Sequence, residues 1–253
     1  MASDQRLDGI IIATPPAFHA EMAVTSLAAG LHVLVEKPMT TSNEETRRLT
    51  DVARANCRMV VVGHTHLFSN AFRKLKEKGA ELGPLKEIRS SAGNWGPYRE
   101  DTNVLWDWAP HDIAMSLDLV GSDPVRSGIK RIATARLPVG PGEALEIFLE
   151  FPGGVEAVIH LSNIDTQKSR RFEATFENGT LIYDDLAEDK LRMIISPTAE
   201  GIAIPVDSST PLEVLISEFA ADIRSGTQTH PSLQLGVRVV NLLENFQKIL
   251  DAV

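Results

Sequence analysis

The first 63 residues alternate between short apolar runs and segments with helical spacing, and this alternation restricts the fold more than any other feature. The apolar runs at 9–13, 32–36 and 58–63 predict strands that are buried on both faces. The segments 17–30 and 42–56 between them predict helices. Strand, helix, strand, helix, strand with short connections is typical of a parallel sheet with crossover helices. The segment therefore predicts half of a doubly wound α/β domain.

The pattern changes after residue 64. Two predicted helices, 71–83 and 110–121, flank a predicted strand, and most of the chain from there to about residue 195 reads as strand. Turn signals at Pro152-Gly153-Gly154 and Asn178-Gly179 suit hairpins between these strands. Two more helices close the chain. We therefore expect residues 65–253 to form an α+β domain with a largely antiparallel sheet, after a first domain at 1–64.

Charge and cysteine content restrict the partners and the compartment. The formal net charge is −9, which argues against nucleic acid and anionic membranes as partners. Cys57 is the single cysteine, so no internal disulfide is possible and a reducing compartment fits. The first apolar run is too short for a signal core or a membrane span. We expect a cytoplasmic protein, and we see no spacing of residues that indicates a metal site.

Polar residues that follow the predicted strands are candidates for a ligand site. Ligands bind outside the carboxyl ends of strands in open parallel sheets, and Glu36-Lys37-Pro38 lies at such an end. Pro38 restricts the turn, so Lys37 can bring a positive charge to a defined place. The loop ATPPAFH at 13–19 follows the preceding strand. Lys37 taken alone is equally well explained as a surface lysine.

A second candidate lies in the predicted helix VLWDWAPHDIAMSLDLVG. Asp107 and His111 are four residues apart, which places them on one helix face. A carboxylate one turn from an imidazole can orient it and stabilise its charged form, as a general base requires. The alternative is that Asp107 merely caps the helix and that His111 is a hydrogen-bonded polar residue. His64 and His66, after the third strand, are possible substrate contacts or simply end the strand.

The order of these motifs closely resembles the Gfo/Idh/MocA family of NAD(P)-dependent oxidoreductases. TPPAFH is followed by AGLHVLVEKP, VVGH, KLKEKGAELGPLKEI, DWAPHD and LVG, and the similarity continues into EFAADIRSG and HPSLQLGVRVVNLLE. The resemblance implies an N-terminal Rossmann domain for NAD or NADP. It also implies a C-terminal sheet domain, at 65–253, that binds a sugar or polyol and pairs with another copy to give a homo-oligomer.

The resemblance also implies roles for individual residues. Lys37 would contact substrate and nicotinamide, and His111, paired with Asp107, would move the hydroxyl proton. The nicotinamide side of the cofactor site would be lined by Thr14, Pro15, His19, Glu36 and Pro38. The reaction implied is hydride transfer between a nicotinamide and a carbinol carbon.

The loop NWGPYRED is a candidate substrate contact. Trp95, Tyr98 and Arg99 carry aromatic and guanidinium groups that suit a sugar face or a phosphate. The substrate would then be a free sugar, a polyol or a nucleotide sugar. The alternative is an exposed loop with one anchored tryptophan.

No G-x-G-x-x-G occurs anywhere in the chain, although family members begin with this phosphate-binding turn. GIIIATPP matches a strand from the second half of the Rossmann fold. We therefore expect 1–64 to be the C-terminal half of that domain, in a chain shortened by gene truncation, a late start or a partial sequence. The segment that discriminates NAD from NADP would be absent. A non-catalytic substrate-binding or assembly module derived from such an enzyme is the alternative function.

The missing fingerprint leads to a first prediction. The 253-residue chain should bind NAD(H) and NADP(H) weakly, because the backbone turn that holds the pyrophosphate is not in this sequence. Isothermal titration calorimetry with both cofactors measures this directly. A micromolar dissociation constant for either cofactor would contradict the expectation.

Overall fold

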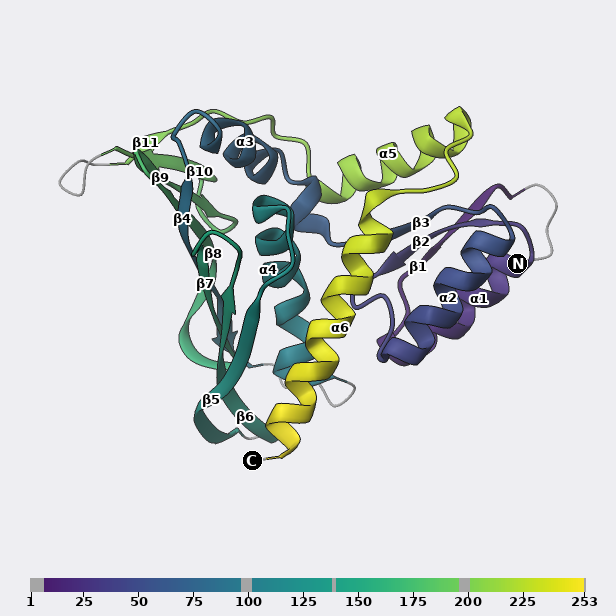
Figure 1. Ribbon diagram of the computed structural model, residues 1–253, viewed down its shortest axis with the longest axis horizontal. Helices are drawn as coiled ribbons and strands as arrows, with labels where there is room; N and C mark the ends of the chain where they lie inside the picture. The colour runs from purple at the N-terminus through teal and green to yellow at the C-terminus, as the bar shows by residue number, and fades with distance from the viewer. Residues whose placement is uncertain (1–6, 97–101, 138–139, 196–200, 253) are drawn as a thin grey trace.

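The computed structural model describes residues 7–96, 102–137, 140–195 and 201–252, and it contains two sheets joined by helices (Figure 1). The smaller sheet is parallel, in the order β1-β2-β3. Its strands are β1 (Gly9–Ile12), β2 (His32–Glu36) and β3 (Val60–Gly63). The crossover helices are α1 (His19–Ala28) and α2 (Asn43–Ala55). The predicted strand–helix alternation is confirmed.

The two faces of the smaller sheet are covered from opposite ends of the chain. On one face, Val33, Val35, Val60 and Val62 pack with buried residues of α1 and α2. The other face is covered by helix α5 (Pro211–Ser225), which returns from the C-terminal end of the chain (Figure 1). The sequence pattern had placed both closing helices with the second domain. Helix α5 instead packs against the first sheet, because β2 and β3 present apolar side chains on both faces.

Strand β1 is less buried than expected. The apolar run was predicted to be covered on both faces, but only Ile12 is buried and Ile11 is 47% exposed. The physical reason is position, since β1 pairs with β2 alone and lies at the edge of the sheet. Helix α5 reaches only the start of β1: a Cβ added to Gly9 would lie 2.8 Å from Ile223 Cδ1 and 3.1 Å from Phe219 Cζ.

The larger sheet has eight strands in the order β11-β10-β9-β8-β4-β7-β6-β5, and only the β4–β7 pair is parallel among the pairs of described strands. The strands are β4 (Leu85–Trp95), β5 (Arg126–Leu137), β6 (Gly140–Glu150), β7 (Glu156–Ser162), β8 (Ile164–Phe176), β9 (Gly179–Asp184), β10 (Leu191–Ile194) and β11 (Ile202–Ala203). The expected largely antiparallel sheet is confirmed.

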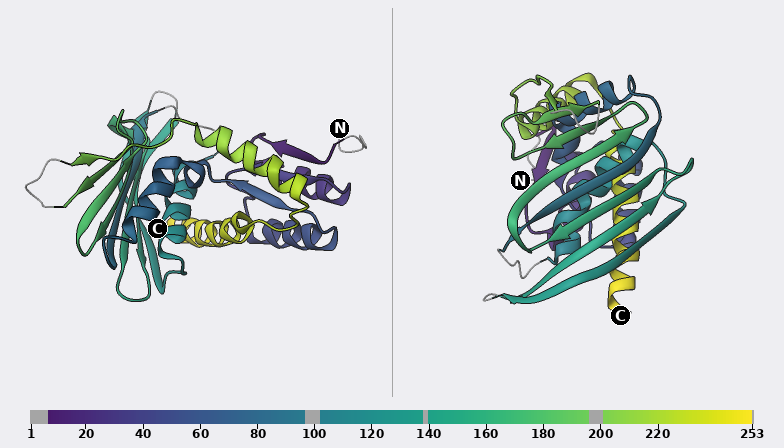
Figure 2. Two further views of the ribbon diagram at one scale, coloured as in Figure 1. Left: turned by 90° about the horizontal axis from the view of Figure 1, so that it is seen from above. Right: turned by 90° about the vertical axis from the view of Figure 1, so that its left-hand side faces the viewer.

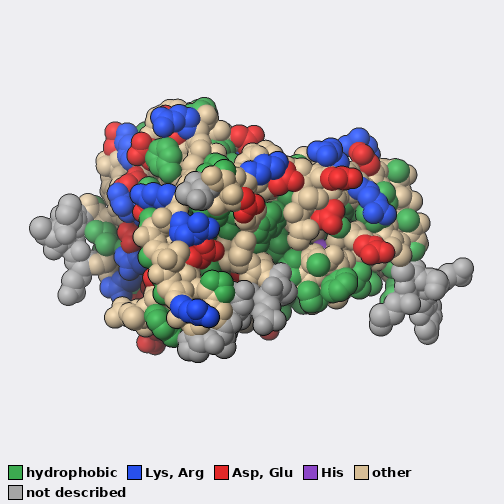
Figure 3. All heavy atoms as spheres, turned by 90° about the horizontal axis from the view of Figure 1, so that it is seen from below, with side chains coloured by type: hydrophobic (Ala, Val, Ile, Leu, Met, Phe, Trp, Pro, Cys, Tyr) green, Lys and Arg blue, Asp and Glu red, His purple; other side chains and the backbone are tan. Residues whose placement is uncertain are grey.

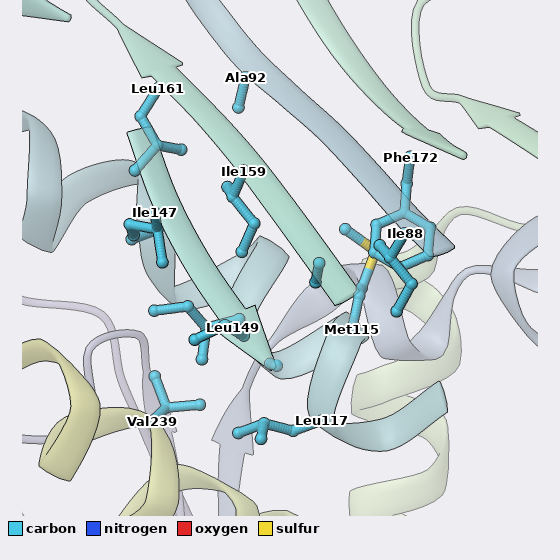
Figure 4. Close-up of a cluster of buried hydrophobic side chains, with 14 of the residues drawn as sticks. Ile88, Ala92, Met115, Leu117, Ile147, Leu149, Ile159, Leu161, Phe172 and Val239 are labelled. Atoms are coloured by element: carbon cyan, nitrogen blue, oxygen red, sulfur yellow. The ribbon is translucent and has the colours of Figure 1, made fainter. Parts of the chain in front are cut away.

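Helices α3 (Asn70–Gly79) and α4 (Val104–Val120) lie on the face of the larger sheet that is turned toward the smaller one (Figure 2). Figure 4 shows the core between sheet and helices, where Ile147, Leu149 and Ile159 of the strands face Leu117 of α4 and Val239 of α6. The opposite face of the sheet is not covered by any described helix, as the right-hand view of Figure 2 shows.

Helix α6 (Pro231–Asp251) lies between the two sheets and contacts both parts of the molecule. Val239, Leu243 and Phe246 belong to the core of the larger sheet. Near its start, a Cβ added to Gly236 would lie 2.9 Å from Val62 Cγ2, so only glycine permits this close approach to β3. The helix thereby sets the position of the smaller sheet against the larger one. No helix among the described residues is long and apolar enough to span a membrane.

The contact of α5 with the smaller sheet gives a stability prediction. Leu215 is fully buried against Leu34 and Val61, whereas Leu212 on the same helix is 50% exposed. Leu215→Ala should lower the free energy of unfolding by about 2–5 kcal/mol, because it leaves a cavity under the helix. Leu212→Ala is the matched control and should change it by less than about 0.5 kcal/mol. Urea unfolding followed by circular dichroism measures both, and equal losses would contradict the packing.

Candidate active site

The loops that follow β1 and β2 are held together by one buried histidine. His19, at the start of α1, places Nδ1 2.8 Å from the carbonyl oxygen of Pro38 and Nε2 2.7 Å from that of Thr14. The Lys37–Pro38 peptide bond is cis. At the end of β2, Glu36 accepts a hydrogen bond at Oε2 from the backbone N–H of Lys37, at 3.3 Å. These hydrogen bonds fix the loops at the carboxyl edge of the smaller sheet, and Lys37 lies at that edge directly after β2.

Lys37 connects this edge to the start of α4. Its Nζ donates to the main-chain oxygen of Asp107 at 2.5 Å and to Oδ1 of Asp107 at 3.1 Å. The side chains of this pair are only 17% and 21% exposed. Two of the residues singled out from the sequence thus meet across 70 residues of chain.

Helix α4 places His111 one turn beyond Asp107. The helix begins with a cap in which the Trp106 N–H donates to Asn103 Oδ1, at 3.0 Å, and Pro110 lies inside the helix. The Nδ1 atom of His111 is buried and has no hydrogen-bond partner among the described residues. The ring contacts that of His66 edge to face, with 4.8 Å between centroids.

The electrostatics of His111 differ from what the Asp-x-x-x-His spacing predicts. Burial, followed by the nearby His66 and Lys37, lowers the pKa of His111 well below its ordinary value. The expected stabilisation of the charged imidazole is therefore outweighed by desolvation. At neutral pH the ring is neutral, and it can accept a proton.

A cavity of about 90 Å³ brings these residues together with others, most of which the sequence did not indicate. Lys37, Asp107 and His111 line it, and so do His66, Trp108, Asp112, Arg170 and Tyr183. His66 was noted in GHTH after the third strand, but the sequence carries no sign that β8 and β9 bring Arg170 and Tyr183 opposite α4.

His66 and Tyr183 form one wall of the cavity. The His66 Nδ1 and the Tyr183 hydroxyl are 2.8 Å apart, and burial lowers the pKa of His66 to about 4. The Tyr183 hydroxyl also donates to Asp185 Oδ1, at 3.3 Å. Desolvation raises the pKa of Tyr183, which keeps the phenol protonated.

A larger groove, of about 1460 Å³, adjoins the cavity and shares Asp107 and Trp108 with it. It is lined by residues of both parts of the molecule, including Pro16, Pro38, Thr41, Trp106, Arg131, Arg136, Glu143, Glu244, Gln247 and Lys248. Figure 3 views the molecule from below and shows acidic and basic side chains interspersed on that face.

The remaining predicted residues lie outside the cavity or outside the described chain. His64 is 1% exposed, neither of its ring nitrogens has a hydrogen-bond partner within the described ranges, and burial lowers its pKa to about 3. Trp95 ends β4 and is 59% exposed. Tyr98 and Arg99 fall outside the described residues. In the described chain no group of three or more His, Cys, Asp or Glu side chains could hold a metal ion.

Comparison with known families gives two matches that together span most of the chain. Residues 1–64 match the family described as "Oxidoreductase family, NAD-binding Rossmann fold". Residues 71–182 match the family described as "GFO/IDH/MocA C-terminal domain".

Curated relatives include sugar and inositol dehydrogenases. A scyllo-inositol 2-dehydrogenase (NADP+) of Bacillus subtilis is 29% identical, over 96% of this chain and 77% of its own length. An inositol 2-dehydrogenase of Corynebacterium glutamicum is 30% identical, over 68% of this chain and 53% of its own. A UDP-N-acetylglucosamine 3-dehydrogenase of Acidithiobacillus ferrooxidans is 24% identical over 68% of this chain. The chain spans 54% of the length of that enzyme.

Solved structures share the fold. The crystal structure of a candidate oxidoreductase from Magnetospirillum magnetotacticum MS-1 is 38% identical with a TM-score of 0.90, over 97% of this chain and 81% of its own. An inositol dehydrogenase homologue of Azotobacter vinelandii, complexed with NADH and myo-inositol, has a TM-score of 0.78 at 19% identity. The match covers 97% of this chain and 76% of the chain of that homologue. Because the sequence identity is only 19%, the match shows a shared fold and nothing more.

The burial of His64 predicts a loss of stability in mild acid. Its pKa is about 3 in the folded chain and about 6.5 when unfolded, so the unfolded chain binds the proton first as the pH falls. Between pH 7 and pH 5 this single group should cost about 2 kcal/mol of folding free energy. Urea unfolding at a series of pH values measures the slope.

Replacement of His64 tests whether this residue causes the loss of stability in mild acid. His64→Gln should remove that part of the pH dependence, and His160→Gln, at a partly exposed position (32%), controls for the exchange itself. An NMR titration of the histidine Cε1 protons of the unaltered protein covers the case in which His64→Gln does not fold. A His64 resonance that titrates near pH 6.5 would contradict the prediction.

Proposed function

The chain belongs to the GFO/IDH/MocA family of oxidoreductases, and from that membership we propose that it transfers a hydride between NAD or NADP and a CH–OH group of a sugar or polyol. One observation carries the proposal. Lys37 from the Rossmann part and Asp107 and His111 from α4 line a single cavity at the carboxyl edge of the smaller sheet. A cation and a neutral imidazole at one point suit the oxidation of an alcohol.

The residues at this edge fit the nicotinamide end of the cofactor. His19 ties the loops after β1 and β2 side by side, so their backbone forms a fixed wall next to the cavity. The residues proposed to hold the nicotinamide are Thr14, Pro15, His19, Glu36, Lys37 and Pro38. The bound cofactor supplies the hydride acceptor or donor at its nicotinamide ring.

The chain's own residues handle the proton and the charge. His111 accepts the hydroxyl proton as the carbinol carbon loses its hydride, and it returns that proton in the reverse reaction. Because its pKa is lowered, the ring is neutral and ready to accept at pH 7. Lys37 polarises the substrate oxygen, and its two hydrogen bonds to Asp107 hold the ammonium in place while one donor is left for the substrate.

The groove next to the cavity is the proposed place for the remainder of the substrate. Its volume of about 1460 Å³ is large enough for a nucleotide sugar as well as for a free sugar or polyol. We further propose that copies of the chain pair through the uncovered face of the eight-stranded sheet. That face carries cross-strand ion pairs such as Lys130–Glu146 and Arg126–Glu150.

Activity assays on variants test the proposed function. Reduction of NAD+ and NADP+ is followed at 340 nm with a panel of inositols and aldoses, at cofactor concentrations high enough to offset weak binding. His111→Gln and Lys37→Met should each lower kcat by about 10²–10⁴-fold, far more than they raise the KM for the cofactor, because a proton transfer or its charge partner is lost.

His160→Gln is the matched control for His111→Gln, since His160 pairs with Asp165 on the larger sheet and does not line the cavity. It should keep the kcat of the unaltered protein. Retention of that kcat by His111→Gln at neutral pH would contradict the role of His111. The absence of any cofactor reduction across the panel would contradict the proposed function.

A further inference from the structure

Arg170 is held over an aromatic ring at the wall of the cavity. It lies in strand β8, and its guanidinium carbon is 3.9 Å from the centroid of the Trp108 ring on α4. Both residues line the cavity that also contains Lys37 and His111. Stacking on an indole orients the guanidinium, so the arginine side chain loses less conformational entropy when its N–H groups bind a ligand.

The hydrogen-bonding capacity of this guanidinium is unused. Within the part of the chain that the structure describes, Arg170 makes no side-chain hydrogen bond and no ion pair. Even arginines that are more exposed than Arg170 are paired: Arg73 donates two hydrogen bonds to Glu218, at 2.5 and 2.8 Å, and Arg171 donates one to Glu173. A half-buried arginine with five free donors is costly unless a ligand satisfies them.

The charges that face Arg170 leave these donors available. Desolvation by burial lowers the pKa of Arg170, and the nearby Asp112, Asp107 and Asp185 oppose this by favouring the charged form. The buried Asp112 accepts from the Ser90 hydroxyl, and desolvation raises its pKa to about 6. Asp107 accepts from Lys37, and Asp185 accepts from Tyr183 and Lys190. The three carboxylates compensate the charge of Arg170 from a distance but accept none of its hydrogen bonds.

We propose that Arg170 binds a carboxylate of the substrate, so that the substrate is an acidic sugar or polyol such as an aldonate. The inference deepens the proposed function and rests on it. At about 90 Å³ the cavity holds only one end of a ligand, so the carboxylate lies close to the hydroxyl that reacts at His111. The guanidinium fork matches a carboxylate with two parallel hydrogen bonds. A phosphate dianion is disfavoured because Asp107 and Asp112 line the same space.

The matched probes are D-gluconate and D-glucitol, which differ by a carboxylate in place of a CH₂OH group. Calorimetric titrations in the presence of NADH, at the high concentration that offsets its weak binding, should give a dissociation constant for gluconate that is about 10–100-fold lower than that for glucitol, the range expected for hydrogen bonds to a charged group. Glucose 6-phosphate is the third probe and should bind more weakly than gluconate.

Variants assign the preference to Arg170. Arg170→Met should remove the preference for gluconate and leave the affinity for glucitol within a few-fold, and Arg170→Lys should restore only part of it, since an ammonium lacks the fork. Arg89→Met on the neighbouring strand β4 is the control, because Arg89 is exposed and paired with Glu87. The dissociation constants for gluconate and glucitol are compared within the same variant. A smaller folded fraction would affect both probes alike and would not imitate a lost preference for gluconate.

Equal affinity for gluconate and glucitol would overturn the inference, as would a preference that survives Arg170→Met, tighter binding of glucose 6-phosphate, or no binding of any probe. A parallel assay of cofactor reduction separates the two proposals. If both probes are oxidised with equal kcat/KM, the inference fails and the proposed function stands. If gluconate is preferred through Arg170 but no cofactor is reduced, binding by Arg170 is supported and the proposed function fails.

Discussion

A parallel sheet with apolar side chains on both faces must be covered on both faces, and the arrangement of this molecule depends on that requirement. In β2 and β3 every strand residue between Val33 and Val35, and between Val60 and Val62, is buried. The crossover helices can cover only one face. The other is covered by Leu215 and Phe219 of α5, so the end of the chain is held against its beginning.

This packing also positions the site. Helix α6 follows α5 and passes from β3, where Gly236 permits close contact, to the core of the larger sheet. The smaller sheet is thereby fixed against α4, and its carboxyl edge meets the first turn of that helix. The hydrogen bonds from Lys37 to Asp107 are made at this junction. The cavity therefore exists only where the two parts of the molecule are packed together.

Burial gives the cavity its chemical character. The pKa is lowered for His66 and His111, which line the cavity, and for His64, which lies outside it, with desolvation as the largest cause in each case. The positive charge of Lys37 adds to the effect, and the result is a group of neutral imidazoles beside fixed cations. Such surroundings favour a ligand that brings negative charge or develops it during reaction. The prediction that Asp107, one helical turn away, stabilises the charged form of His111 is therefore wrong, because desolvation has the larger effect on the pKa of His111.

The sequence by itself determined most local elements and four residues of the cavity. Period and turn residues predicted the strands of both sheets except the two-residue β11, and Lys37, His66, Asp107 and His111 were identified because strand ends and helix spacing are local properties. The sequence did not predict which residues from distant segments join the cavity. Arg170 and Tyr183 lie in strands whose sequences carry no sign of a ligand, and α5 has an ordinary amphipathic pattern that fits either domain. Their places depend on which apolar faces remain to be buried once the strands have paired, and only tertiary packing decides that.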